Sequence, residues 1–235
     1  MEQTNPFQDG RVLLVDKPLD ATSFFAVKRI RGAIRRAYNV RKIKVGHAGT
    51  LDPKATGLLI ICTGKQTKSI HIYQGQEKEY TGTIRLGEAT PSSDTETEVN
   101  ETASTEHITG ELLDRIRKSF IGEILQAPPL FSAIRIDGER AYEKARRGEE
   151  VEVKKRLVTV SEFDIDSRDF PDIHFRITCS KGTYIRSIAR DFGLALNTVG
   201  YLTSLRRTKI GEFDVDDALS IEETIALIDQ TASSQ

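Results

Sequence analysis

The sequence has 235 residues, of which 38% are hydrophobic and 29% are charged, and its formal net charge is −1 at pH 7. This composition is typical of a globular protein with a sizeable core. The longest apolar run, Leu58 to Cys62, is too short to span a bilayer, and the polar first ten residues show no secretory signal. The distant Cys62 and Cys179 and four scattered histidines favour buried thiols and no metal site. We therefore expect a cytoplasmic protein without a membrane segment.

Charge is distributed very unevenly along the chain. Eight basic residues and no acids lie between Lys28 and Lys44, whereas six acids and no Lys or Arg lie between Glu88 and Glu106. The acidic stretch is rich in Ser and Thr and lacks aromatics, so we expect an exposed loop. The basic run could be a solubilising face, but it leads directly into a glycine-rich loop and favours a phosphate-rich partner.

Apolar periodicity predicts the elements of the first part of the chain. Residues 11–15 form a buried strand, and Thr22 or Ser23 caps a helix. The apolar face of that helix carries Phe24, Val27, Ile30 and Ile34. A neighbouring stripe carries the cations Lys28, Arg31 and Arg35. A strand at 58–62, a helix at 65–73, a strand at 79–86 and an amphipathic helix at 112–120 follow.

The second part of the chain continues with strands and helices in irregular order. Residues 128–153 form a short, self-contained pattern that suggests a projecting lobe. Strands at 156–165 and 174–179, a helix at 185–196, two strands within 201–213 and a capped helix from Ser220 complete the pattern. Strands and helices without regular alternation indicate an α+β fold, with helices flanking a mixed, mostly antiparallel central sheet.

The loop from Val45 to Gly57 contains the most unusual residues of the chain. Asp52 precedes Pro53, which is typical of a helix N-cap, but Gly57 and a β-type apolar run follow too soon for a stable helix. The proline also favours an extended conformation at Asp52, and a rigidly held carboxylate can act as a nucleophile. The residues alone leave both roles open.

A second polar loop runs from Ser180 to Arg186. Arg186 precedes an apolar helix and should be partly buried, so it needs a carboxylate partner; Lys181 could be a plain surface cation. Tyr80 and Tyr184 could be core aromatics or stacking surfaces for an unpaired base. His47 has no metal-binding partner at suitable spacing, which leaves a loop hydrogen bond or a wedge against a nucleotide.

Several motifs together resemble the TruB family of tRNA pseudouridine synthases. The most specific is Gly46-His47-Ala48-Gly49-Thr50-Leu51-Asp52-Pro53 with Ala55-Thr56-Gly57-Leu58-Leu59. Five further blocks occur in order over nearly the whole chain: Asp16-Lys17-Pro18, Lys78-Glu79-Tyr80 with Arg85-Leu86-Gly87, the RNA-clasping insertion at about 128–153, Cys179 to Arg186, and Leu205-Arg206-Arg207-Thr208. The resemblance implies a pseudouridine synthase fold in a single catalytic domain spanning 1–235.

The resemblance also implies an activity and roles for individual residues. Asp52 attacks a uridine in the T loop of tRNA, at position 55, and the uracil detaches, turns and rejoins the ribose through C5. Arg186 pairs with Asp52 and Lys17 supports the catalytic loop. The target base and the RNA around it are contacted by Tyr80, which stacks on the flipped-out base, and by His47, Tyr184, Leu205 and Lys181. An isomerisation involves no net redox change, so no cofactor is implied.

The chain departs from the family pattern at its C-terminal end. Many members carry a PUA domain that grips the acceptor end of tRNA, and the sequence ends soon after the helix from Ser220. We therefore expect a monomer without a PUA domain that binds the T arm alone almost as well as whole tRNA. A non-catalytic tRNA-folding chaperone is the alternative. A glycosidase-like hydrolase is disfavoured, because such enzymes commonly use two facing carboxylates and no second acid stands in either loop.

Overall fold

The computed structural model describes residues 5–129, 135–136, 139–140 and 154–234. They divide into two compact units. The first unit contains the residues up to Glu79 and those from Arg206 onward, and the second contains Tyr80–Leu205. The strand β12 (Gly200–Ile210) contributes to both. No helix in the described ranges is long and apolar enough to cross a membrane.

The first unit is built around the buried strand β3 (Thr56–Thr63). β1 (Val12–Lys17) and β2 (Val45–His47) pair with β3 in antiparallel fashion, and the end of β12 pairs with it in parallel. Its remaining elements are α1 (Pro6–Asp9), α2 (Ser23–Ala37), a 3₁₀ helix (Gly64–Ser69), α3 (Ile70–Gly75), β13 (Phe213–Asp214), a second 3₁₀ turn (Val215–Asp217) and α7 (Ile221–Ser233). The helix predicted at 65–73 is thus a 3₁₀ segment followed by α3.

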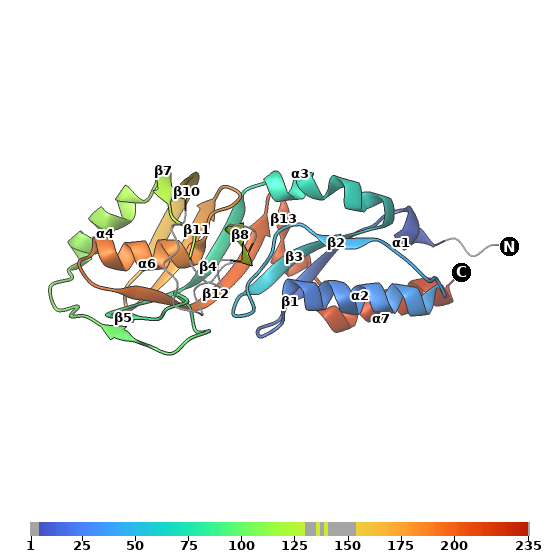
Figure 1. The fold of residues 1–235 in the computed structure, drawn as a ribbon, viewed down its shortest axis with the longest axis horizontal. Helices are drawn as coiled ribbons and strands as arrows, with labels where there is room; N and C mark the ends of the chain where they lie inside the picture. Colours follow the sequence, from blue (N-terminus) through green and yellow to red (C-terminus); the bar gives the residue numbers. More distant parts are fainter. Residues whose placement is uncertain (1–4, 130–134, 137–138, 141–153, 235) are drawn as a thin grey trace. The chain divides into compact units, whose positions relative to one another are not determined.

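Alternation along β3 places apolar side chains in two cores. Leu59 and Ile61 pack under α2 and α7, which lie side by side in Figure 1. Leu58, Ile60 and Cys62 face the opposite core with Ile210. Because both faces of β3 are covered, apolar residues occupy consecutive positions along the strand.

One residue of α2 does not lie where the sequence predicted. Val27, Ile30 and Ile34 are buried as expected, but Phe24 is 63% exposed. Ser23 is buried instead and is hydrogen-bonded to Leu51. An α-helix turns by about 100° per residue, so fixing Ser23 inward directs its neighbour Phe24 toward solvent.

The second unit contains a five-stranded sheet in the order β12, β4 (Lys78–Leu86), β11 (Asp172–Cys179), β10 (Arg156–Asp166) and β7 (Gly122–Gln126). The pairings of β10 with β11 and β7 are antiparallel. α4 (Gly110–Ser119) packs against β10 and against α6 (Ile185–Ala195) (Figure 1). Phe120, Phe163 and Phe192 meet edge to face in this core, with ring centroids 5.5–6.3 Å apart. The mixed, mostly antiparallel sheet with flanking helices confirms the predicted fold class.

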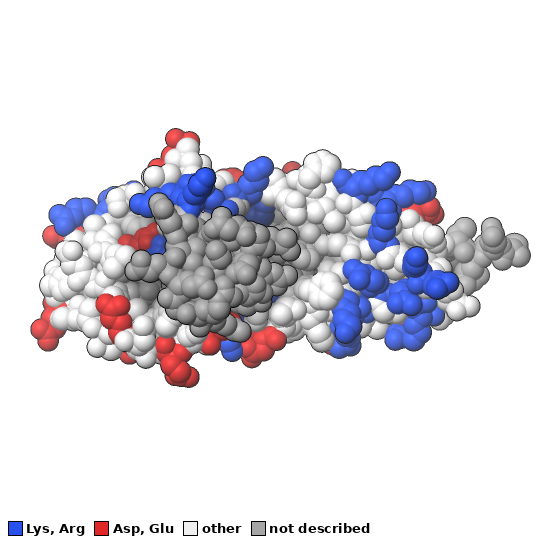
Figure 2. Space-filling model, in the orientation of Figure 1, with Lys and Arg blue, Asp and Glu red and all other residues white. Residues whose placement is uncertain are grey.

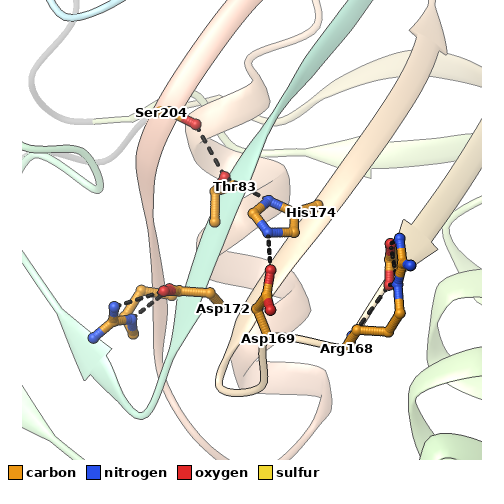
Figure 3. Close-up of polar contacts among 8 residues, drawn as sticks. Thr83, Arg168, Asp169, Asp172, His174 and Ser204 are labelled. Carbon is orange, nitrogen blue, oxygen red and sulfur yellow. Dashed lines mark hydrogen bonds and ion pairs between the residues drawn. The ribbon is translucent and has the colours of Figure 1, made fainter.

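A chain of hydrogen bonds between polar side chains connects strands of this sheet (Figure 3). Ser204 Oγ donates to Thr83 Oγ1 at 3.1 Å, and Thr83 Oγ1 lies 3.0 Å from His174 Nδ1. His174 Nε2 lies 2.9 Å from Asp169 Oδ2. These contacts join β12, β4 and β11 to the loop before β11, which explains why polar residues alternate with buried ones along these strands.

The prediction of an exposed acidic loop at 88–106 is wrong for part of that stretch. Thr90, Ser92, Ser93 and Asp94 are buried, whereas most residues from 95 to 106 are exposed. Two short strands, β5 (Glu88–Ala89) and β6 (Glu101–Thr102), pair at the base of the loop. Hydrogen bonds within the loop make its burial possible, because they satisfy polar groups that would otherwise need water.

The predicted lobe at about 128–153 lies almost entirely outside the described residues. Within it, only Pro128, Pro129 and the paired dipeptides β8 (Arg135–Ile136) and β9 (Glu139–Arg140) are described.

Candidate active site

Asp52 lies on a loop of the first unit that connects β2 to β3. Its carbonyl oxygen accepts a hydrogen bond from Ala55 N at 3.1 Å, which closes a turn with Pro53 and Lys54 at its centre. No helix begins there, so the N-cap interpretation of Asp52 is wrong. Leu51 and Ala55 are buried while Asp52 itself is half-buried. The loop therefore anchors its apolar side chains in the core and places a carboxylate at its edge.

Ser23, at the start of α2, ties this loop to the helix. Its hydroxyl accepts from Leu51 N at 2.8 Å and donates to Leu51 O at 3.0 Å. Both backbone groups of the residue before Asp52 are thus satisfied by one buried side chain. Such paired, buried hydrogen bonds restrict the orientation of the backbone next to the Asp52 carboxylate.

Arg207 holds the loop from the other side. This fully buried arginine donates from Nε to Leu58 O at 2.8 Å and from Nη2 to Gly49 O at 3.1 Å. Arg207 pairs in register with Gly57 of β3. Gly57 has a φ of +104°, and a Cβ at this position would lie 2.3 Å from Arg207 O. Arg207 is not among the site residues predicted from the sequence. The signal that could have found it is a pair of adjacent arginines on a strand, because alternation directs one of them inward.

Lys17, at the end of β1, supports the loop from below. Its ammonium group is fully buried and donates to Pro18 O at 2.9 Å and Ala21 O at 2.7 Å. Burial lowers the pKa of Lys17 to about 8, and the negative charge of Asp52 acts in the opposite direction. The turn that Lys17 holds contacts the Asp52 loop through a hydrogen bond from Asp20 N to Pro53 O at 2.9 Å.

His47 lies at the end of β2, opposite Ile61 of β3. Burial lowers the pKa of its imidazole, and the positive charge of Arg207 lowers it further. Both effects favour the neutral imidazole, which carries no charge that would have to be buried.

In the second unit, Arg186 lies at the start of α6 with its side chain almost completely buried. Its Nε lies 3.6 Å from Asp94 Oδ2, and its Nη1 donates to Ser92 O at 3.1 Å. Arg186 therefore has a carboxylate neighbour that the sequence did not predict, on the loop that was predicted to be exposed. Pairing of Arg186 with Asp52 stays a prediction.

The remaining predicted residues of this unit lie on two strands and one loop. Tyr184 is held by Gln126, whose amide pairs with Tyr184 N and O at 2.8 and 3.0 Å, and the guanidinium of Arg156 lies 4.5 Å above the Tyr184 ring. Lys181 is exposed in the preceding turn. Tyr80 and Leu205 belong to the neighbouring strands β4 and β12, Tyr80 nearly buried and Leu205 half-buried.

A basic recess of about 630 Å³ lies in the first unit. Figure 2 shows Lys and Arg side chains gathered over this unit. The recess is lined by the end of α2, the segment before β2 and the first 3₁₀ helix. Its cations are Arg31, Arg35, Arg41, Lys42, Lys44, Lys65 and Lys68. Five of them belong to the basic run from Lys28 to Lys44, so the fold concentrates that run into one surface suited to phosphates.

Comparison with known proteins identifies the class to which this fold and site belong. Residues 35–185 match the model for the TruB family pseudouridylate synthase N-terminal domain. In its fold, the chain resembles a solved Cbf5–Nop10–Gar1 complex, with a TM-score of 0.67 and 26% identity over 94% of this chain. The chain spans 54% of the matched chain of that complex.

The curated relatives are more similar and match over nearly their full length. A tRNA pseudouridine synthase B of Flavobacterium johnsoniae is 54% identical over 216 residues, which cover 92% of this chain and 94% of the relative. A second, from Phocaeicola vulgatus, is 51% identical and covers 95% of each chain. This chain belongs to the TruB family of pseudouridylate synthases.

Proposed function

We propose that the protein isomerises uridine to pseudouridine in tRNA. The observation that carries the proposal is the full-length similarity to tRNA pseudouridine synthase B, together with a half-buried Asp52 on a loop held from three sides. Asp52 acts as the nucleophile and bonds to C1′ of the ribose as the C–N glycosidic bond breaks. C5 of the turned uracil then bonds to C1′ and releases Asp52, the C5 proton leaves to solvent, and N1 takes up a proton. No electrons are transferred overall, so the reaction needs no redox cofactor.

The other site residues act on the RNA and on Asp52. Tyr80 stacks on the extruded uracil, and Tyr184 and Leu205 line the base pocket. Such stacking contributes about 1–3 kcal/mol per base and offsets much of the free energy needed to extrude it. His47 enters the RNA loop, and Lys181 contacts the phosphate backbone. Arg186 orients the Asp52 carboxylate, and Lys17 supports the turn beside it.

The reaction is tested by tritium release from tRNA labelled at C5 of uridine. Wild-type protein is expected to release tritium, and Asp52→Asn is expected to release none while still binding the tRNA. No release by the wild type would refute the proposed reaction. Equal release by both proteins would remove Asp52 from the mechanism. The comparisons favour catalysis over a purely chaperone function, and the same pair of proteins separates the two.

We further propose that the substrate region is the T arm, with uridine 55 as the target, and that a cytoplasmic monomer acts on it. The basic recess supports binding of an RNA backbone, because it gathers seven cations on one surface. A T-arm hairpin is expected to bind almost as tightly as whole tRNA in a filter-binding assay. A tenfold or greater loss with the hairpin would contradict the proposal, and light scattering of the free protein checks the monomer.

A further inference from the structure

Phe24 is the most exposed aromatic side chain in the described part of the chain, at 63%, and it follows Ser23 at the start of α2. Its neighbour Ser23 is hydrogen-bonded to both backbone groups of Leu51, the residue before Asp52. Phe24 therefore directly follows Ser23, which holds Leu51, the residue before the proposed nucleophile Asp52. A single exposed aromatic ring is common on protein surfaces, so the meaning of Phe24 depends on the charges that follow it along the helix.

Cations follow Phe24 along the same side of α2. Residues at i+4, i+7 and i+11 lie on one helical stripe, and here they are Lys28, Arg31 and Arg35. Eleven residues of α-helix cover about 16 Å at ~1.5 Å per residue. Arg31 and Arg35 line the basic recess. The stripe thus runs from the exposed ring of Phe24 to the basic recess of the first unit.

The adjacent stripe of the same helix has a different environment. Arg29 and Arg36 form ion pairs with Glu222 and Asp229 of α7, at 3.4 and 3.2 Å. Phe25 lies beneath Arg29, whose guanidinium carbon is 5.7 Å from the ring centroid. Among the ion pairs of the described residues, none involves Lys28 or Arg35. The positive charges of Lys28 and Arg35 on the stripe that begins at Phe24 are therefore available to bind a polyanion.

We propose that Phe24 is a stacking platform for an unpaired base of the substrate RNA next to the target uridine, with Lys28 and Arg35 following the RNA backbone. Proteins that bind single-stranded nucleic acid combine aromatic platforms with a cationic track in this way. The inference rests on the proposed function, since it takes RNA to be the substrate. It adds a positioning residue on α2 that none of the sequence motifs includes.

The test compares three variants for binding to a T-arm hairpin by filter binding. Phe24→Ala is expected to raise Kd about tenfold, within the range of base–aromatic stacking, and Phe24→Tyr is expected to stay within about twofold of wild type because it keeps the ring. Phe25→Ala is the matched control, an identical change one residue away on the stripe beside α7, and should also stay within about twofold. Equal Kd values for Phe24→Ala and Phe25→Ala would overturn the proposal, as expected if this surface serves a protein partner or a second copy.

Hairpins with a single abasic nucleotide identify the stacked base. One abasic position is expected to weaken wild-type binding about tenfold and to leave Phe24→Ala binding unchanged, because the same contact is already lost. Additive losses at every position would overturn the proposal. Tritium release by the wild type distinguishes the two proposals: without release the proposed reaction fails, whereas release with additive losses refutes the Phe24 platform alone.

Discussion

Lys17 ends β1 with a fully buried ammonium group that is hydrogen-bonded to two carbonyl oxygens. In the unfolded chain its pKa is the ordinary 10.5, and in the folded protein burial lowers it to about 8. The folded state therefore binds fewer protons than the unfolded state between these values. Stability associated with Lys17 is lowest below pH 8 and rises toward pH 10.5.

We expect this linkage to be measurable by urea unfolding. Between pH 7.5 and 10, wild type should gain on the order of 2 kcal/mol relative to Lys17→Met, which has no ammonium group to titrate. Comparing the two proteins at each pH cancels the titration of all other groups. A constant difference across this range would show that the pKa of Lys17 is not lowered in the folded protein.

Asp94 is a second residue whose importance depends on one buried contact. Removing its charge leaves the almost completely buried guanidinium of Arg186 without this carboxylate. We expect Asp94→Asn to lower the free energy of unfolding by about 3 kcal/mol and to slow tritium release, because breaking a buried ion pair is strongly destabilising. Asp166→Asn, at the exposed pair with Arg168, is the control and should change stability little. Similar effects at both sites would argue against a special role for Asp94.

At the scale of elements, Gly57 of β3 pairs with Arg207 of β12 and leaves no room for a side chain. An alanine there would need a positive φ and would place its Cβ 2.3 Å from the carbonyl oxygen of Arg207. Both the strain and the clash would disturb the strand pairing next to the Asp52 loop. Neither can be relieved by rotating a side chain, because the colliding atom belongs to the backbone.

We therefore expect Gly57→Ala to destabilise the protein by at least about 2 kcal/mol. Gly32→Ala is the matched control. Gly32 lies within α2, and a methyl group added there would meet nothing within 4 Å, so alanine should stabilise the helix by up to about 1 kcal/mol. Urea denaturation of both variants checks the signs, and a neutral Gly57→Ala would mean that the two strands can separate at this point.

Most elements could be predicted from periodicity, and the exceptions have physical reasons. α6 buries the predicted Ile185, Ile188 and Phe192, because an apolar face at helical spacing has one way to be covered. The polar residues of the segment 90–94 predict a solvated loop, yet the segment is buried. Its burial depends on hydrogen bonds from its own hydroxyl groups to the backbone oxygen of Asp94 and on Arg186, which lies some 90 residues away in the sequence. Local composition contains no such information.

At the scale of the whole molecule, a net charge of −1 coexists with a strongly basic recess. Electrostatic attraction of RNA depends on this local field and not on the total charge. Binding should therefore weaken steeply as salt rises, with a slope set by the number of phosphates that are neutralised. The proposed RNA partner makes this a direct test of the recess.

We expect the double variant Arg35→Ala, Lys42→Ala to reduce the slope of log K against log salt by about 1–2. Arg168→Ala removes an exposed cation of the second unit that is bonded to Asp166, and it serves as the control with an unchanged slope. Filter binding of the T-arm hairpin at several salt concentrations measures both. An unchanged slope in the double variant would place RNA binding elsewhere.

The sequence by itself determined the α+β class, the order of most strands and helices, and the family, because periodicity and ordered motifs are properties of the chain. It also singled out Asp52, but its local physics left a helix cap and a nucleophile equally open. Tertiary structure decided that Asp52 sits on a turn held by Ser23, Lys17 and Arg207, that Asp94 is the buried partner of Arg186, and that Phe24 faces solvent. Each of these depends on contacts between residues far apart in the chain, which only packing specifies.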